Sequence, residues 1–193
     1  MFIIAGHYRH QRLNLPKGTH TRPSASRLRE ALFNICQSKI EDARFLDLFA
    51  GSGAVGLEAL SRGAKTATFV DSHAESVRCI QKNIAQLKVA PQCQILMGDV
   101  LKMLKWLDKQ KQTFDIIFAD PPYQTCVNET EKIFFSEAVI RFIDQSTLLA
   151  PEGRLFIEED DRHQPRLEDL QTLRLHNTRR LGQAALQQYF TPI

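Results

Sequence analysis

The stretch Asp47-Leu-Phe-Ala-Gly51-Ser-Gly53-Ala-Val-Gly56 decides the fold, because its glycines have the G-x-G-x-x-G spacing of a nucleotide-binding loop. Apolar residues before it predict a strand, and the residues after it predict a helix. Glycines between a strand and a helix let the backbone turn tightly and approach a ligand closely. A turn without a ligand would use the same glycines, and nicotinamide and flavin enzymes share the pattern. The stretch therefore predicts a parallel α/β sheet and leaves the ligand open.

Strand and helix patterns alternate along the chain around this loop. We expect strands at Phe45–Phe49, Thr66–Val70, Gln94–Met97, Phe114–Ala119 and Arg154–Glu158, helices at Ala54–Ser61, His73–Leu87, Val100–Lys109 and Glu129–Ile143, and a closing pair at Leu173–Arg180 and Ala184–Phe190. The alternation predicts an α/β, Rossmann-like fold, with a mostly parallel seven-stranded sheet, helices on both faces and a closing antiparallel hairpin. Ligands of such sheets bind beyond the carboxyl ends of the strands.

The 193 residues suit a single domain, and no linker, repeat or low-complexity tract divides them. An N-terminal helix is indicated by apolar residues at helical spacing from Leu28. We expect a basic β-hairpin arm over 1–23, with strands at Phe2–Ala5 and Arg12–Leu15, the N-terminal helix over 24–40, and a Rossmann-like catalytic core over 44–193.

Positive charge is concentrated at the start of the chain. Residues 1–30 carry six Lys or Arg against the single acid Glu30, a local charge of +5 in a chain whose total is +3. A basic segment joined to a nearly neutral body favours an arm that contacts nucleic-acid phosphates, with Arg9 and Arg12 as the contacts. A solvated basic surface is the alternative interpretation of the same charges.

Two carboxylates follow the second and third expected strands. Asp71 stands 20 residues after Gly51, where a carboxylate accepts hydrogen bonds from ribose hydroxyls. Asp99 stands in Met97-Gly-Asp-Val100, where it would accept the amino group of an adenine, although either acid can also cap a helix. A nicotinamide enzyme would account for Asp71 but not for the motif after the fourth strand.

The fourth expected strand ends in Asp120-Pro121-Pro122-Tyr123, whose prolines stop the strand and restrict the backbone. An exocyclic aryl amine is a poor nucleophile, because its lone pair is delocalised into the ring. The Asp120 carboxylate and the Pro121 carbonyl can accept its two N–H groups and stabilise the positive charge that develops on nitrogen during methyl transfer. Tyr123 offers a ring on which an extruded base stacks. A structural Pro-Pro turn with a surface tyrosine is the alternative.

Other features narrow the class of protein. The four cysteines form no C-x-x-C pair, so we expect reduced thiols rather than a zinc site or disulfides. No apolar run reaches the roughly 18 residues of a membrane span, and no secretory signal is recognisable, so we expect a cytoplasmic protein. Glu158-Glu-Asp-Asp161 is expected to form a solvated loop after a strand.

Three motifs resemble those of the class I amino-methyltransferases: Asp47–Gly53, Leu57–Gly63 and Asp120–Tyr123. Further matches narrow the resemblance to the bacterial small-subunit ribosomal RNA guanine-N2 methyltransferases. These matches are Arg22-Pro-Ser24, Arg27–Asn34, and Gly182-Gln183 leading to Tyr189. The resemblance covers nearly the whole chain. Because DNA adenine methyltransferases share the glycine and Asp-Pro-Pro-Tyr motifs, the N-terminal match carries the narrower assignment.

The resemblance implies S-adenosylmethionine as the cofactor, no metal, and the exocyclic N2 of a guanine in small-subunit ribosomal RNA as the methyl acceptor. It implies a cofactor site made of Asp47, Phe49, Gly51, Ser52 and Gly53 around the methionine part, Asp71 at the ribose, and Asp99 and Val100 at the adenine. It further implies that Asp120, Pro121 and Tyr123 hold the target base, with Arg22 and Ser24 near the mouth of the active site.

Two other functions stay open at this point. A DNA adenine-N6 methyltransferase shares the motifs, but such enzymes need a sizeable element to read DNA, and only 46 residues precede Asp47. A non-catalytic RNA-binding assembly factor could keep the fold, although an intact Asp120 and Tyr123 argue against it. We expect instead a monomer that recognises the shape of structured ribosomal RNA, within a partly assembled ribosomal particle.

Overall fold

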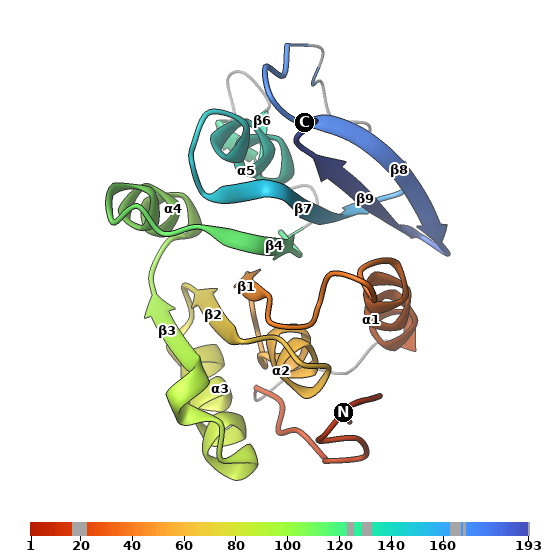
Figure 1. Cartoon of the computed structure of the whole chain (residues 1–193), viewed down its shortest axis with the longest axis vertical. Coiled ribbons are helices and arrows are strands. Elements are labelled where there is room, and N and C mark those ends of the chain that lie inside the picture. The colour runs from red at the N-terminus through yellow and green to blue at the C-terminus, as the bar shows by residue number, and fades with distance from the viewer. Residues whose placement is uncertain (17–22, 123–125, 129–132, 163–166, 168, 193) are drawn as a thin grey trace.

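The computed structural model describes residues 1–16, 23–122, 126–128, 133–162, 167 and 169–192. A seven-stranded sheet runs through the molecule, with helices on both of its faces (Figure 1). The elements are α1 (Pro23–Ile35), β1 (Arg44–Leu48), α2 (Ala54–Ser61), β2 (Thr66–Asp71), α3 (Ala74–Leu87), the 3₁₀ turn η1 (Ala90–Gln92), β3 (Cys93–Met97), α4 (Val100–Lys109), β4 (Phe114–Ala119), β5 (Cys126–Asn128), β6 (Ile133–Phe134), α5 (Phe135–Asp144), β7 (Leu149–Asp160), β8 (Arg174–Leu181) and β9 (Ala184–Phe190).

The strand order is β3-β2-β1-β4-β7-β9-β8, which confirms the predicted Rossmann-like fold. The first five strands in this order are parallel, and β9 and β8 close the sheet as an antiparallel pair. The chain builds outward from β1 to β3 and then returns to place β4 on the other side of β1. Ligands of open α/β sheets bind at such a reversal of strand order, beyond the carboxyl ends of the strands.

Each face of the sheet has its own apolar core, because the central strands alternate their side chains between two covered faces. In β1, Phe45 packs on the face covered by α1, α2 and α3, whereas Leu46 and Leu48 pack on the face covered by α4 and α5. No helix in the described part of the chain has the length and apolar character that crossing a bilayer requires.

The first 16 residues lie against the face that carries α2 and α3. The two predicted strands are reduced to one antiparallel bridge, between Phe2 and Arg12, although backbone hydrogen bonds still join Ile3 to Gln11. Ile3 and Leu13 are buried in the core of that face. The segment is a packed loop, because side chains of α2 and α3 bind backbone groups that a longer hairpin would have paired.

Three other expectations differ from the structure. The helix predicted over 129–143 begins only at Phe135, because residues 126–128 and 133–134 form the small antiparallel pair β5–β6. The N-terminal helix predicted over 24–40 ends at Ile35, and a turn follows it. The expected solvated loop at 158–161 is wrong, because β7 continues to Asp160 along β9 and buries Glu159 and Asp160.

Candidate functional site

The predicted site residues converge on one edge of the sheet, at the reversal of strand order. Leu48 of β1 lies in register with Val70 of β2 and Ala119 of β4, so the residues that follow these strands emerge side by side. The backbone N–H of Asp120 also donates to the Leu48 carbonyl at 3.4 Å. The turn after β4 therefore adjoins the glycine loop that follows β1.

The glycine loop has a backbone that its glycines make possible. Gly51 and Gly53 have φ angles of 55° and 75°, in the left-handed region that suits glycine. At Gly56, a Cβ would lie 2.4 Å from the Phe69 ring, so a side chain there would push α2 away from β2. A Cβ at Gly51 would meet nothing within 4 Å, so this part of the loop presents open backbone. Phe49 also has a positive φ of 60°.

Asp71 ties the end of β2 to the glycine loop. Its carboxylate accepts the Gly51 N–H and the His73 N–H, each at 2.8 Å, and its side chain is nearly buried. The His73 Nδ1 also lies 3.3 Å from Oδ1, so the described contacts gather on Oδ1. Each carboxylate oxygen has about two acceptor sites, and Oδ2, which accepts the Gly51 N–H, keeps a site for a further donor. The geometry places Asp71 at the predicted edge, and its contact with a ribose stays a prediction.

Asp99 and Val100 begin α4, next to the end of β3. The Asp99 carboxylate accepts the Lys102 N–H at 3.0 Å, which confirms that Asp99 caps the helix. The Asp99 side chain is exposed and the Val100 side chain is buried. The Asp99 carboxylate is therefore accessible to the predicted adenine. At Val100 only the backbone could make the predicted contact, because the side chain is buried.

Asp47 lies beneath the loop rather than on its open side. It is 1 % exposed, and its Oδ2 accepts the Gly56 N–H at 2.9 Å. Burial raises the pKa of Asp47 to about 8, the Gly56 hydrogen bond opposes this shift, and the negative charge of Asp71 adds to it. Asp47 thus holds the first turn of α2 against the end of β1, which shapes the loop from within.

This burial predicts a pH dependence of stability. Because the pKa of Asp47 is about 8 when folded and near its ordinary value of 3.8 when unfolded, the folded state binds more protons between these values. The free energy of unfolding should therefore fall as pH rises through this range. Asp47→Asn keeps an acceptor for Gly56 but cannot titrate, so urea unfolding across the range should show a flatter profile in this variant. A constant difference between variant and parent at every pH would contradict the assignment.

The turn after β4 carries the predicted catalytic residues. The Asp120 side chain is exposed at the sheet edge, and Pro121 is buried behind it. Tyr123 lies outside the described residues, so its predicted stacking role remains a prediction. Within the described ranges, no group of three or more His, Cys, Asp or Glu side chains is arranged to hold a metal ion.

The basic tip of the N-terminal arm lies away from this edge. The His7 N–H donates to the Ser61 carbonyl at 2.7 Å and the Tyr8 N–H donates to the Ser61 hydroxyl at 2.9 Å, at the last residue of α2. Eight residues of α-helix separate that end from the glycine loop, a length of about 12 Å. The exposed side chain of Arg9 is therefore at the far end of α2 from the loop.

The other predicted RNA contacts are less completely described. The Arg12 side chain is exposed, and its carbonyl accepts a hydrogen bond from Gln86 of α3. Arg22 lies outside the described residues, and of Ser24 only its place in α1 is described. Among the described contacts of Arg12, none is with the glycine loop.

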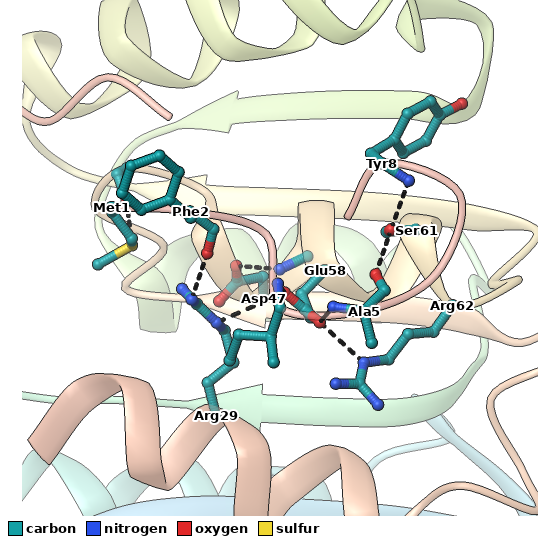
Figure 2. Close-up of polar contacts among 12 residues, drawn as sticks. Met1, Phe2, Ala5, Tyr8, Arg29, Asp47, Glu58, Ser61 and Arg62 are labelled. Atoms are coloured by element: carbon teal, nitrogen blue, oxygen red, sulfur yellow. Dashed lines mark hydrogen bonds and ion pairs between the residues drawn. The ribbon is translucent and has the colours of Figure 1, made fainter. Parts of the chain in front are cut away.

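Sequence reasoning missed a buried carboxylate, Glu58 of α2, that anchors the arm (Figure 2). Glu58 is 0 % exposed and accepts the backbone N–H groups of Ile4 and Ala5 at 2.7 and 3.0 Å. It also accepts a hydrogen bond from Arg62 at 2.9 Å and lies 3.7 Å from the buried Arg29 Nε. An acid within the otherwise apolar helix 54–61 was the available signal.

Asn83 of α3 is a second residue that was missed. Its side chain is fully buried, although it lies on the same helical face as the apolar residues Ile80 and Leu87. Its Oδ1 accepts the Asn14 N–H at 2.8 Å, and its Nδ2 donates to the Ser52 carbonyl at 2.9 Å. A single carboxamide thus joins the arm to the glycine loop.

A separate cleft of about 400 Å³ opens at the opposite edge of the sheet, where β1 to β4 begin. Its lining includes Arg44, Thr66, Gln94 and Thr113. Of the predicted cofactor and catalytic residues that the structure describes, none lines it, and Arg44 is already paired with Asp115. The convergence of the loop, Asp71 and Asp120 therefore marks the carboxyl edge as the candidate site.

Comparison with known proteins identifies a family and several relatives that this chain resembles over most of its length. A family model described as Conserved hypothetical protein 95 matches residues 1–190. The chain is 35 % identical over 159 residues to the Escherichia coli protein named Ribosomal RNA small subunit methyltransferase D, which covers 82 % of this chain and 74 % of that one. The protein of the same name from Haemophilus influenzae is 32 % identical over 159 residues, with 82 % and 78 % covered.

A solved structure extends the likeness to nearly the full length. A hypothetical protein of Thermus thermophilus superposes with a TM-score of 0.79 at 27 % identity, covering 97 % of this chain and 98 % of that one. The likeness therefore includes the N-terminal segment and the closing hairpin as well as the central sheet.

Proposed function

We propose, since the chain belongs to the family described as Conserved hypothetical protein 95, that this protein transfers a methyl group from S-adenosylmethionine to the N2 of a guanine in small-subunit ribosomal RNA. Relatives at 32–35 % identity are named ribosomal RNA small subunit methyltransferases. The observation that carries the proposal is the adjacency of Asp120 to the glycine loop, which Leu48 enforces from the end of β1.

The residues at the carboxyl edge fit the cofactor. Open backbone at Gly51 leaves room for a ligand, and the Asp71 Oδ2 keeps an acceptor site for a ribose hydroxyl. The exposed Asp99 carboxylate supplies an acceptor for an adenine amino group two strands away from β1. When bound, S-adenosylmethionine supplies an electrophilic methyl carbon on a positively charged sulfur.

Asp120 and Pro121 supply the chemistry on the side of the base. The Asp120 carboxylate and the Pro121 carbonyl accept the N–H groups of the exocyclic amine, which holds its lone pair toward the methyl carbon. Positive charge grows on nitrogen as the new N–C bond forms, and the fixed negative charge of Asp120 stabilises it. The same carboxylate then accepts the proton that leaves the methylated nitrogen, which restores a neutral amine.

The substrate must present its base outside a helix, because the amine has to reach Asp120. Extracting a base from a duplex costs a few kcal/mol, whereas a base in a loop costs less. A partly assembled small-subunit particle in the cytoplasm, bound by a monomer of this protein, fits this requirement. A guanine is proposed over an adenine because of the family, since the Asp-Pro-Pro motif handles either amine.

The function is tested by comparing three substrates with labelled cofactor: naked ribosomal RNA, small-subunit particles and duplex DNA. Nucleoside analysis of the digests should show N2-methylguanosine in the ribosomal substrates. Label found only as N6-methyladenosine in DNA would instead establish the DNA enzyme. Cofactor binding with no transfer to any substrate would favour a non-catalytic assembly factor.

Asp71→Ala should weaken S-adenosylmethionine binding. Loss of hydrogen bonds to a charged group costs roughly 1.5–3 kcal/mol, which corresponds to roughly a 10- to 150-fold rise in Kd. Isothermal titration calorimetry measures this directly. Glu152→Ala, which removes an exposed carboxylate at the opposite edge of the sheet, should leave the affinity at the parent value. Unchanged affinity in Asp71→Ala would remove this carboxylate from the site.

A further inference from the structure

The strand β8 forms the edge of the sheet opposite β3 (Figure 1). It carries a row of basic side chains, and these are exposed. Residues 174–180 are all exposed, and the strand contains no acid. We call the side chains of Arg174, His176, Arg179 and Arg180 the basic edge. A strand of eight residues in which nearly every side chain faces solvent contributes little to the core, so its composition requires another explanation.

The end of the basic edge that carries Arg179 and Arg180 reaches the same sheet edge as Asp120, whereas Arg174 lies further back along β8, in register through β9 and β7 with the first half of β4. Leu181, the last residue of β8, pairs with Ala184 of β9, which in turn pairs with Asp160 at the carboxyl end of β7. β8 lies three strand spacings from β4, or about 14 Å. It lies on the side of β4 away from β1, β2 and β3, whose ends carry the candidate cofactor residues. An RNA strand that enters the site from the free side would pass over β7, β9 and β8.

The charges of the arginines on β8 are compensated to different degrees. Arg180 is paired with Asp161 at 2.7 Å. Arg174, in contrast, donates from Nη1 to backbone carbonyls, including that of Leu173 at 2.9 Å, which orient the guanidinium without neutralising it. Among the residues that the structure describes, no carboxylate lies within ion-pair distance of Arg174 or Arg179. Guanidinium groups of this kind suit phosphate oxygens, which they bind in bidentate geometry.

The position of the N-terminal arm strengthens the case. Its tip is bonded to Ser61 at the far end of α2, so Arg9 is remote from the turn after β4. Phosphates close to the methylated base must then meet positive charge elsewhere. Arg179 and Arg180, near the end of β8, are exposed at the carboxyl edge of the sheet and can supply this charge.

We propose that the basic edge binds phosphates of the ribosomal RNA on the flank of the methylated guanine. This inference rests on the proposed function. Charged side chains on an edge strand also prevent pairing with strands of other molecules, and that is the competing explanation. The two explanations differ in one respect: protection of an edge works with charge of either sign, whereas phosphate binding requires positive charge.

The test is the salt dependence of RNA binding by the double variant Arg174→Gln/Arg179→Gln. Each lost phosphate contact should lower the slope of log Kd against log salt by roughly 0.7–0.9, so two contacts should lower it by roughly 1.4–1.8. The KM for the ribosomal substrate should rise, while kcat stays at the parent value because Asp120 is untouched. The matched variant Arg174→Lys/Arg179→Lys keeps the charge and should retain most of the slope.

Two controls separate this result from misfolding and from a general loss of charge. S-adenosylmethionine affinity should be equal in all variants, because the cofactor residues lie on the other side of β4. Lys105→Gln/Lys109→Gln removes the same charge from exposed positions on α4 and should leave the slope unchanged. An unchanged slope and KM in the arginine-to-glutamine variant, with normal methylation by the parent, would overturn the inference and leave the proposed function intact.

The charge-reversed variant Arg174→Glu/Arg179→Glu tests the competing explanation. It should remain monomeric and lose still more RNA affinity if the basic edge binds phosphate. RNA binding like that of the parent, together with self-association of the uncharged glutamine variant, would identify the basic edge as edge protection only. A parent protein that methylates no ribosomal substrate would refute the proposed function, and this inference with it.

Discussion

Asp120→Ala should lower the rate of methyl transfer by about 10²–10³-fold while S-adenosylmethionine still binds with the affinity of the parent. The reason is electrostatic, because the carboxylate stabilises positive charge that appears on the amine only as the methyl group transfers. Its side chain is exposed and lies outside the core, so the variant should fold normally. Single-turnover assays with labelled cofactor would measure the rate, and calorimetry would measure cofactor affinity.

Asp120→Asn provides the matched control, because it keeps a carbonyl acceptor for the amine and loses the negative charge. A rate between those of the parent and the alanine variant would separate the contribution of charge from that of orientation. Near-normal turnover by Asp120→Ala would show that this carboxylate does not act on the amine. Equal loss of cofactor affinity and of turnover would place Asp120 in the cofactor site instead.

Glu58→Ala should lower the free energy of unfolding by about 3–5 kcal/mol, the usual cost of removing one partner from a buried charge network. The substitution leaves the Ile4 and Ala5 N–H groups without their acceptor and removes the carboxylate nearest to the buried Arg29. Burial already lowers the pKa of Arg29, and the charge of Glu58 opposes that shift. Urea unfolding followed by circular dichroism would measure the change.

Two further variants are needed to interpret the change in unfolding free energy of Glu58→Ala. Glu58→Gln keeps the size and one carbonyl acceptor, so it should lose less stability than Glu58→Ala. Glu30→Ala removes an exposed acid from α1 and should change stability by less than about 0.5 kcal/mol. If Glu58→Ala is too unstable to purify, amide exchange at Ile4 and Ala5 in Glu58→Gln still reports whether the arm loosens. A loss below about 1 kcal/mol in Glu58→Ala, well under the cost of orphaning a buried charge, would mean that the carboxylate does not anchor the arm.

Several elements could be placed from sequence because their signals are local. Four have the bounds that were predicted from apolar periodicity: α2, α4, β4 and β9. The failures arose where distant pairing outweighed local pattern. Residues 133–134 read as part of a helix but pair with 126–128, and the acidic run after Glu158 read as a loop but continues along β9.

The order of the motifs also determined the outline of the candidate site. Parallel strands end at one edge of a sheet, so a glycine loop after the first strand and acids after the second and fourth had to converge there. The structure places Gly51, Asp71 and Asp120 at that edge, as this rule predicts.

The sequence by itself thus determined the sheet, its carboxyl edge and the residues that line that edge. The periodicity of apolar residues, the spacing of the glycines and the order of the motifs can each be recognised in the linear sequence. Only the tertiary structure decided which buried polar groups hold these stretches together. Glu58 binds backbone groups 53 and 54 residues away, and Asn83 joins Asn14 to a loop 31 residues before it. Such partners are chosen because a polar group enclosed by packed elements must find a hydrogen bond, and the packing alone determines which groups lie within reach.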